Sequence, residues 1–113
     1  MIQILHNPRC TKSREVFNYL AEKGVEAEEI RYIDNPLSAE ELREIANKIG
    51  IKPIDWVRKT EALYKSELKG KTLSDDQWFE ILSQNPRLIE RPVVINGDKA
   101  VIGRPFNKIF DIL

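Results

Sequence analysis

The sequence predicts an α/β fold built on a four-stranded mixed sheet that is flanked by helices. Three observations lead to this fold class. The chain opens with a strand, a helix and a strand within about 33 residues, the pattern of a βαβ unit with parallel strands and a right-handed crossover. Apolar residues at helical spacing occupy the middle of the chain. Near its end, two short apolar runs around an Asn-Gly pair indicate a β-hairpin, which a last helix follows.

The opening βαβ unit is defined by its apolar runs and its turn residues. Ile2–Leu5 is a short apolar run, ended by a turn sequence that contains Pro8, and we expect a buried strand there. Apolar residues recur at helical spacing from about residue 11 to residue 23, and Gly24 stands where a helix C-cap belongs. Glu29–Ile33 is expected to form the second strand.

The middle of the chain carries the start signals of several helices. Ser38 with Glu41 and Ser74 with Gln77 have the spacing of capping boxes, in which each side chain binds the backbone N–H of the other residue. Pro53 can open a short helix between them. The aromatic side chains of this region are expected to be core or partly buried packing: Trp56, Tyr64, Trp78 and Phe79.

The end of the chain returns to strands. Residues 92–95 and 100–102 are predicted to pair around the Asn96-Gly97 turn. A last helix can begin at Pro105, and we expect it to bury its four large apolar side chains: Phe106, Ile109, Phe110 and Leu113. The resulting order, β-α-β, helices, β-β-α, is that of the thioredoxin-like architecture. The 113 residues are therefore predicted to form one thioredoxin-like domain with a helical insertion at about residues 38–89.

Composition excludes several classes of function. Eighteen basic residues balance eighteen acidic ones, which gives no indication of a nucleic-acid or membrane surface. The start lacks the basic and apolar regions of a signal peptide, and no window approaches the ~20 apolar residues of a membrane span, so we expect a cytoplasmic protein. A single cysteine excludes an internal disulfide and a metal site made of four thiolates, and with only one histidine in the chain a zinc site is effectively excluded as well.

Cys10 is the residue on which the functional prediction rests. A lone cysteine is most often a buried structural thiol. Cys10, however, follows a strand and a turn and begins a helix, where unpaired backbone N–H groups and the positive end of the helix dipole favour an anion. Helix N-termini and nearby cations lower the pKa of a thiol from about 8.5 into the range ~3.5–7.5. We therefore predict a reactive thiolate at Cys10.

The neighbours of Cys10 supply further candidates. His6, at the end of the first strand, is either a turn residue with a satisfied ring nitrogen or a group that pairs with the thiol or acidifies it, and the spacing leaves both open. Ser13 could hydrogen-bond the sulfur or only its local backbone. The backbone amides from Thr11 to Arg14 are expected to face the thiolate, an arrangement that suits an oxyanion.

Three arginines stand beside structural breaks. Arg58 lies in the predicted insertion, Arg91 precedes Pro92, and Arg104 precedes Pro105. A single arginine is usually a solvated surface group. Arg91 is the strongest exception, because in thioredoxin-like folds the residue before the third strand belongs to a cis-proline turn that faces the nucleophile. The fork-shaped guanidinium group suits tetrahedral oxyanions.

Four segments, in this order, carry a resemblance to a known family: HNPRCTKSR at 6–14, RKTEALYK at 58–65, ERPVV at 90–94 and IGRP at 102–105. Together they resemble the arsenate reductase family that works with glutaredoxin. The resemblance implies a thioredoxin-like fold with a helical insertion. It also implies that Cys10 is the nucleophile, that His6 tunes its acidity, and that the three arginines above bind the oxyanion.

The implied reaction fits a chain with one thiol. Reduction of arsenate to arsenite takes two electrons, so further thiols must come from outside. In the family scheme, the Cys10 thiolate attacks arsenic, glutathione as co-substrate attacks the adduct, and glutaredoxin resolves the mixed disulfide. No bound cofactor is needed.

Two other functions remain open at the level of sequence. One is a general glutathione-linked thiol oxidoreductase. The other is a non-catalytic relative that regulates transcription by binding RNA polymerase. The regulators carry a C-x-x-C switch, and Ser13 occupies its second position here, which argues against that alternative.

Overall fold

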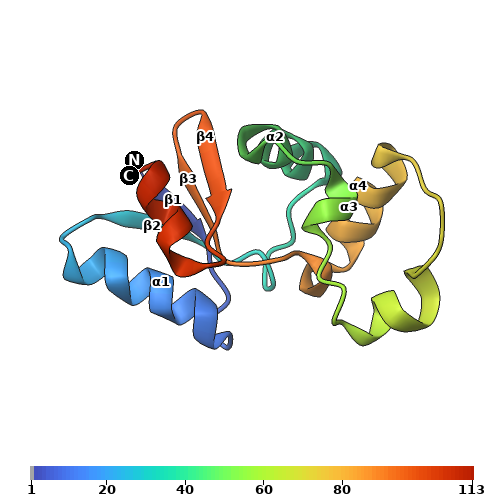
Figure 1. Ribbon diagram of the computed structural model, residues 1–113, viewed down its shortest axis with the longest axis horizontal. Coiled ribbons are helices and arrows are strands. Elements are labelled where there is room, and N and C mark those ends of the chain that lie inside the picture. Colours follow the sequence, from blue (N-terminus) through green and yellow to red (C-terminus); the bar gives the residue numbers. More distant parts are fainter. Residues whose placement is uncertain (1) are drawn as a thin grey trace. The chain divides into compact units, whose positions relative to one another are not determined.

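The computed structural model describes residues 2–113, and the chain divides into two compact units (Figure 1). The first consists of Met1–Asn35 together with Arg91–Leu113, and the second of Pro36–Glu90. The bounds of the second unit lie close to those of the predicted helical insertion. The first unit holds all four strands of the sheet and the whole helix that follows Cys10.

The sheet of the first unit has four strands in the order β2-β1-β3-β4, with β1 at Ile2–Leu5, β2 at Ala27–Ile30, β3 at Val93–Asn96 and β4 at Lys99–Ile102. Strand β1 pairs in parallel with β2 and antiparallel with β3, and β3 pairs antiparallel with β4. The predicted mixed sheet is confirmed. Because β1 and β2 run in parallel, the residues that follow their carboxyl ends lie at the same edge of the sheet.

One face of the sheet is covered by α1, Thr11–Glu22, and by a 3₁₀ helix at Phe106–Asp111 (Figure 1). The buried side chains that join these elements form one apolar core: Ile4, Val16, Leu20, Val94 and Ile109. Their burial fixes α1 against the sheet and therefore fixes the position of the helix start at Cys10.

The second strand lies earlier than predicted. It covers Ala27–Ile30 rather than Glu29–Ile33. After Ile30 the chain leaves the sheet through a turn, in which the N–H groups of Asp34 and Asn35 donate to the carbonyl oxygen of Arg31. The apolar residues beyond Ile30 therefore belong to this turn, and their hydrophobicity reflects burial rather than strand pairing.

The C-terminal segment departs from prediction in two ways. The hairpin is present, but its two-residue loop is Gly97-Asp98, because Asn96 pairs with Lys99 inside the ladder. The expected burial of Phe110 and Leu113 is wrong, since they are 48% and 47% exposed. The last helix is a 3₁₀ helix with three residues per turn, so the positions three apart from Phe106, at 109 and 112, share the core face and Phe110 does not.

The second unit is helical, as predicted. It contains α2 at Ala39–Ile49, α3 at Pro53–Trp56, α4 at Asp75–Gln84, a π-helical turn at Tyr64–Leu68 and a 3₁₀ turn at Pro86–Leu88. Both capping boxes are formed. The aromatic side chains are core as expected: the indoles of Trp56 and Trp78 and the ring of Phe79 are buried, and Tyr64 is half-buried. The π-helical turn was not predicted.

Candidate active site

Cys10 is the N-cap residue of α1, with an extended backbone at φ −96° and ψ 122°. Its N–H donates to the carbonyl oxygen of Asn7, which closes the turn after β1, and its own carbonyl oxygen accepts the first helical hydrogen bond from Arg14. The residue is only 8% exposed and its thiol is free. The strand, the turn and the helix therefore hold one buried thiol at the positive end of the α1 dipole.

The surroundings of Cys10 act on its pKa in opposite directions. Burial raises the pKa, because it disfavours the charged thiolate. The backbone N–H of Ser13, the side chain of Arg91 and the backbone N–H of Lys12 lower it by hydrogen bonding to the thiolate, and the Arg91 charge adds to this effect. The stabilising contacts prevail, so the pKa of Cys10 lies below its ordinary value. This is the condition for a reactive thiol.

Arg91 is the cation that reaches the sulfur, although it lies far away in sequence. It precedes β3 through a cis peptide bond to Pro92 and is only 7% exposed. Its Nε atom is buried and has no hydrogen-bond partner within residues 2–113. Its carbonyl oxygen accepts a hydrogen bond of 2.7 Å from Nε of Arg104, so these two arginines lie side by side. Arg104 precedes a second cis peptide bond, to Pro105.

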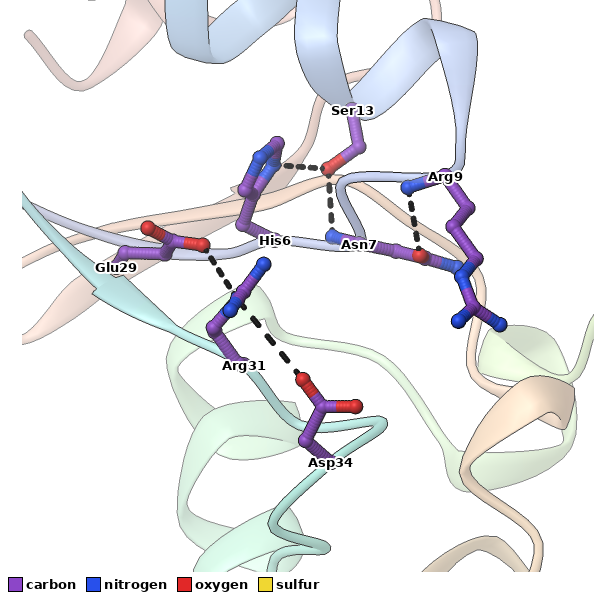
Figure 2. A network of polar contacts seen from close by, with 7 residues as sticks. All are labelled: His6, Asn7, Arg9, Ser13, Glu29, Arg31 and Asp34. Carbon is purple, nitrogen blue, oxygen red and sulfur yellow. Dashed lines mark hydrogen bonds and ion pairs between the residues drawn. The ribbon is translucent and has the colours of Figure 1, made fainter.

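The side chain of His6 is directed at the hydroxyl group of Ser13 on the first turn of α1 (Figure 2). Nδ1 of His6 lies 2.7 Å from Oγ of Ser13, and that oxygen also accepts a hydrogen bond of 3.0 Å from the N–H of Asn7. The imidazole stacks on the ring of Phe17, with 4.7 Å between centroids. The hydroxyl of Ser13 thus binds His6 and the turn, while its backbone N–H is the group directed at the sulfur.

The charge state of His6 follows from its burial. The side chain is 4% exposed, and this desolvation lowers its pKa. Glu29 opposes the shift, whereas the charges of Arg31 and Arg14 reinforce it. The imidazole is therefore neutral near pH 7, and it fixes the Ser13 side chain rather than supplying a positive charge to Cys10.

Thr11 and Arg14, both predicted at an oxyanion site, are exposed on the first turn of α1. The guanidinium of Arg14 donates to the carbonyl oxygen of Pro8 and to Oγ1 of Thr11. The backbone N–H of Arg14 donates to the carbonyl oxygen of Cys10. The expectation that this amide faces the thiolate is therefore wrong, because the helix uses it. The helix-start amides directed at the sulfur are those of Lys12 and Ser13.

The family of the chain follows from comparison with known proteins. Residues 5–112 match the model of the ArsC family. The chain belongs to this family.

Its relatives include an arsenate reductase of Haemophilus influenzae, 44% identical over 97% of each chain. An arsenate reductase of Neisseria meningitidis is 39% identical, over 99% of this chain and 97% of the relative. The structure of an arsenate reductase from Vibrio cholerae matches with a TM-score of 0.93 at 37% identity, covering 99% and 97% of the two chains. The thioredoxin-like fold predicted from the sequence is confirmed.

Arg58, the remaining predicted anion ligand of this ArsC chain, belongs to the second unit. Its N–H donates to the carbonyl oxygen of Leu88 and its Nη1 lies 4.0 Å from Oε1 of Glu61. Its participation in the site of Cys10 stays a prediction. Within residues 2–113, His, Cys, Asp and Glu side chains form no group of three that could hold a metal ion. No helix in the same range is long and apolar enough to cross a membrane.

Sequence reasoning missed the charged residues near His6 that lie at the end of β2 and directly after it. Arg31 pairs with Glu29 at 2.9 Å and with Asp34 at 3.9 Å (Figure 2). Arg31, Ile33 and Asp34 line a cleft of about 270 Å³ together with His6 and the turn at residues 7–9. The topology could have indicated this cluster. Because β1 and β2 are parallel neighbours, their carboxyl ends lie at the same edge of the sheet, and the residues that follow the two strands lie close together there.

Proposed function

We propose that this ArsC chain reduces arsenate to arsenite, with the Cys10 thiolate as nucleophile. One observation carries the proposal. A single free thiol at a helix start has its pKa lowered beside a buried arginine whose Nε has no hydrogen-bond partner in the described part of the chain. A buried donor without a partner costs about 1–3 kcal/mol, and an oxygen of a bound oxyanion would satisfy it. The arsenate reductases of Haemophilus influenzae and Neisseria meningitidis support arsenate as that oxyanion.

The first step forms a bond between sulfur and arsenic. The thiolate of Cys10 attacks arsenate, one arsenic–oxygen bond breaks, and the departing oxygen takes up protons from the solvent and leaves as water. Arg91, Arg104 and the amides of Lys12 and Ser13 stabilise the negative charge on the remaining oxygens. Arg58 is proposed to join them, as the resemblance to the family implies.

The second step supplies the electrons. Glutathione attacks the sulfur of the Cys10–arsenic adduct, the sulfur–arsenic bond breaks, and its electron pair remains on arsenic, which goes from As(V) to As(III). Arsenite leaves, and each of the two sulfurs has lost one electron to form a Cys10–glutathione disulfide. Because the chain has one cysteine, no second thiol of its own can open this disulfide. We propose that glutaredoxin does so by thiol exchange. A reducing compartment such as the cytoplasm suits this cycle.

An assay of arsenite formation with arsenate, glutathione and glutaredoxin tests the proposal. The wild-type protein should produce arsenite, turnover should stop when either thiol component is left out, and Cys10→Ser should fold normally and be inactive. Arsenite formation by Cys10→Ser would contradict the mechanism. Release of glutathione from a glutathionylated protein without arsenate reduction would instead support the general thiol oxidoreductase. Failure of both reactions with retention of RNA polymerase would support the regulator.

A further inference from the structure

Arg14 contacts the chain both before and after Cys10. Its backbone N–H donates to the carbonyl oxygen of Cys10, the first hydrogen bond of α1. Its guanidinium reaches back to the turn before the helix, where Nη1 donates to the carbonyl oxygen of Pro8 at 2.7 Å. On the other side of Cys10, Nη2 donates to Oγ1 of Thr11 at 3.3 Å. One side chain therefore joins the turn that precedes the thiol to the helix that follows it.

The same turn is stabilised at its start by the contacts of Asn7 (Figure 2). The N–H of Asn7 donates to Oγ of Ser13 at 3.0 Å, and its Oδ1 accepts a hydrogen bond of 3.1 Å from the N–H of Arg9. The guanidinium of Arg14 adds a contact further along the turn, at the carbonyl oxygen of Pro8. The turn is thus tied to the first turn of α1 by two side chains, those of Ser13 and Arg14.

We propose that Arg14 is a positioning residue for the nucleophile, because its bridge between the turn and α1 fixes the direction of the Cys10 side chain toward the amides of residues 12 and 13. The inference rests on the proposed function only in taking Cys10 as the reacting thiol. A guanidinium suits this task, since its planar fork carries N–H donors in fixed directions and one group can serve two acceptors. The single ammonium group of a lysine lacks this fork.

The contacts of Arg14 favour this role over that of the anion ligand predicted from the sequence. Both terminal nitrogens of its guanidinium donate to oxygens of the protein itself, and a bound anion would compete with them. The guanidinium that acts on the Cys10 thiolate by hydrogen bond and by charge is that of Arg91. An effect of Arg14 on the thiol therefore passes through the turn.

Arg14→Lys tests the bridge, because it keeps the positive charge and replaces the fork by one ammonium group. The rate of Cys10 alkylation is measured against pH, which needs no arsenate. The midpoint should lie about 0.3–0.5 pH unit above that of the wild type, so that alkylation below the midpoint slows about two- to threefold. Arg14→Met, which loses the charge and both side-chain contacts, should move the midpoint at least as far.

Arg9→Lys is the matched control, because Arg9 is an exposed arginine directly beside Cys10. We expect it to leave the midpoint in place. A wild-type midpoint in both Arg14 variants would overturn the proposal, and so would an equal shift in the Arg9 control.

Arsenate affinity in the Cys10→Ser background separates positioning from anion binding. Arg14→Met and Arg9→Met each remove one exposed charge, so both should weaken binding by the same factor, about threefold at most. A loss of roughly tenfold or more that is confined to Arg14→Met would make Arg14 an anion ligand and overturn the proposal. Arsenite formation is measured separately. The expected midpoint shifts in a protein that makes no arsenite reject only the proposed reaction, and arsenite formation with unshifted midpoints rejects only the positioning role.

Discussion

Replacing Arg91 with methionine removes the guanidinium that stabilises the Cys10 thiolate and keeps an apolar stem in its buried position. A hydrogen bond to a charged group is worth about 1.5–3 kcal/mol. Loss of one such contact to the oxyanion should weaken arsenate binding roughly 10- to 150-fold. The same substitution should raise the pKa of Cys10, because it removes both a hydrogen bond and a positive charge from the thiolate.

Two measurements separate these effects. Arsenate affinity is measured on Cys10→Ser with and without Arg91→Met, so that no covalent adduct forms, and the pKa is measured by the pH dependence of thiol alkylation. Arg9→Met is the control, since it removes an exposed guanidinium from the residue next to Cys10. Unchanged arsenate affinity in the folded Arg91→Met variant would remove Arg91 from the anion site. An unchanged alkylation profile would refute its role in activating the thiol.

Three further predictions concern the support of the site. Ser13→Ala leaves the partly buried N–H of Asn7 and the buried Nδ1 of His6 without their partner, so the free energy of unfolding in urea should fall by about 1–3 kcal/mol. The alkylation profile of Cys10 should change little, because the backbone N–H of residue 13 remains. An unchanged free energy of unfolding would contradict this prediction. Burial lowers the pKa of His6, so the unfolded chain binds a proton more readily than the folded chain. The free energy of unfolding should therefore decrease, and the protein become less stable, as the pH drops below about 6.5. In His6→Asn this pH dependence should flatten, and a slope equal to wild type would count against it. Gly103→Ala would place a Cβ 3.3 Å from Cγ of Pro92 and 3.3 Å from Cγ2 of Ile109. We expect the free energy of unfolding to fall by about 1–3 kcal/mol in the same urea experiment, and a neutral result would contradict this expectation.

The sequence predicts those parts of the fold whose signals are local. Both capping boxes, the first strand and the first helix follow from patterns a few residues long, and Cys10 could be placed at a helix start for the same reason. The last helix was mispredicted because the choice between an α helix and a 3₁₀ helix depends on packing against Ile4 and Val94, which are distant in sequence.

In the candidate site, too, the sequence predicts the local features but not the contacts between distant segments. The residue types of His6 and Ser13 indicated a polar site, but their connectivity depends on how the turn after β1 folds back, which brings the Asn7 amide to the Ser13 hydroxyl. The contact of Arg91 with Cys10 joins residues 81 positions apart and requires the β1–β3 pairing. The position before a proline identified Arg91 as a candidate, and only the sheet topology places it beside the thiol.

A titration of the single thiol tests the central claim most directly. The rate of Cys10 alkylation is measured against pH in the folded wild-type protein and again in denaturant, where the same thiol supplies its own reference. We predict a pKa in the folded protein below the denatured value and below about 8.5, the ordinary value for cysteine. A pKa at or above that of the denatured chain would show a buried structural thiol, and the proposed nucleophile would be lost with it.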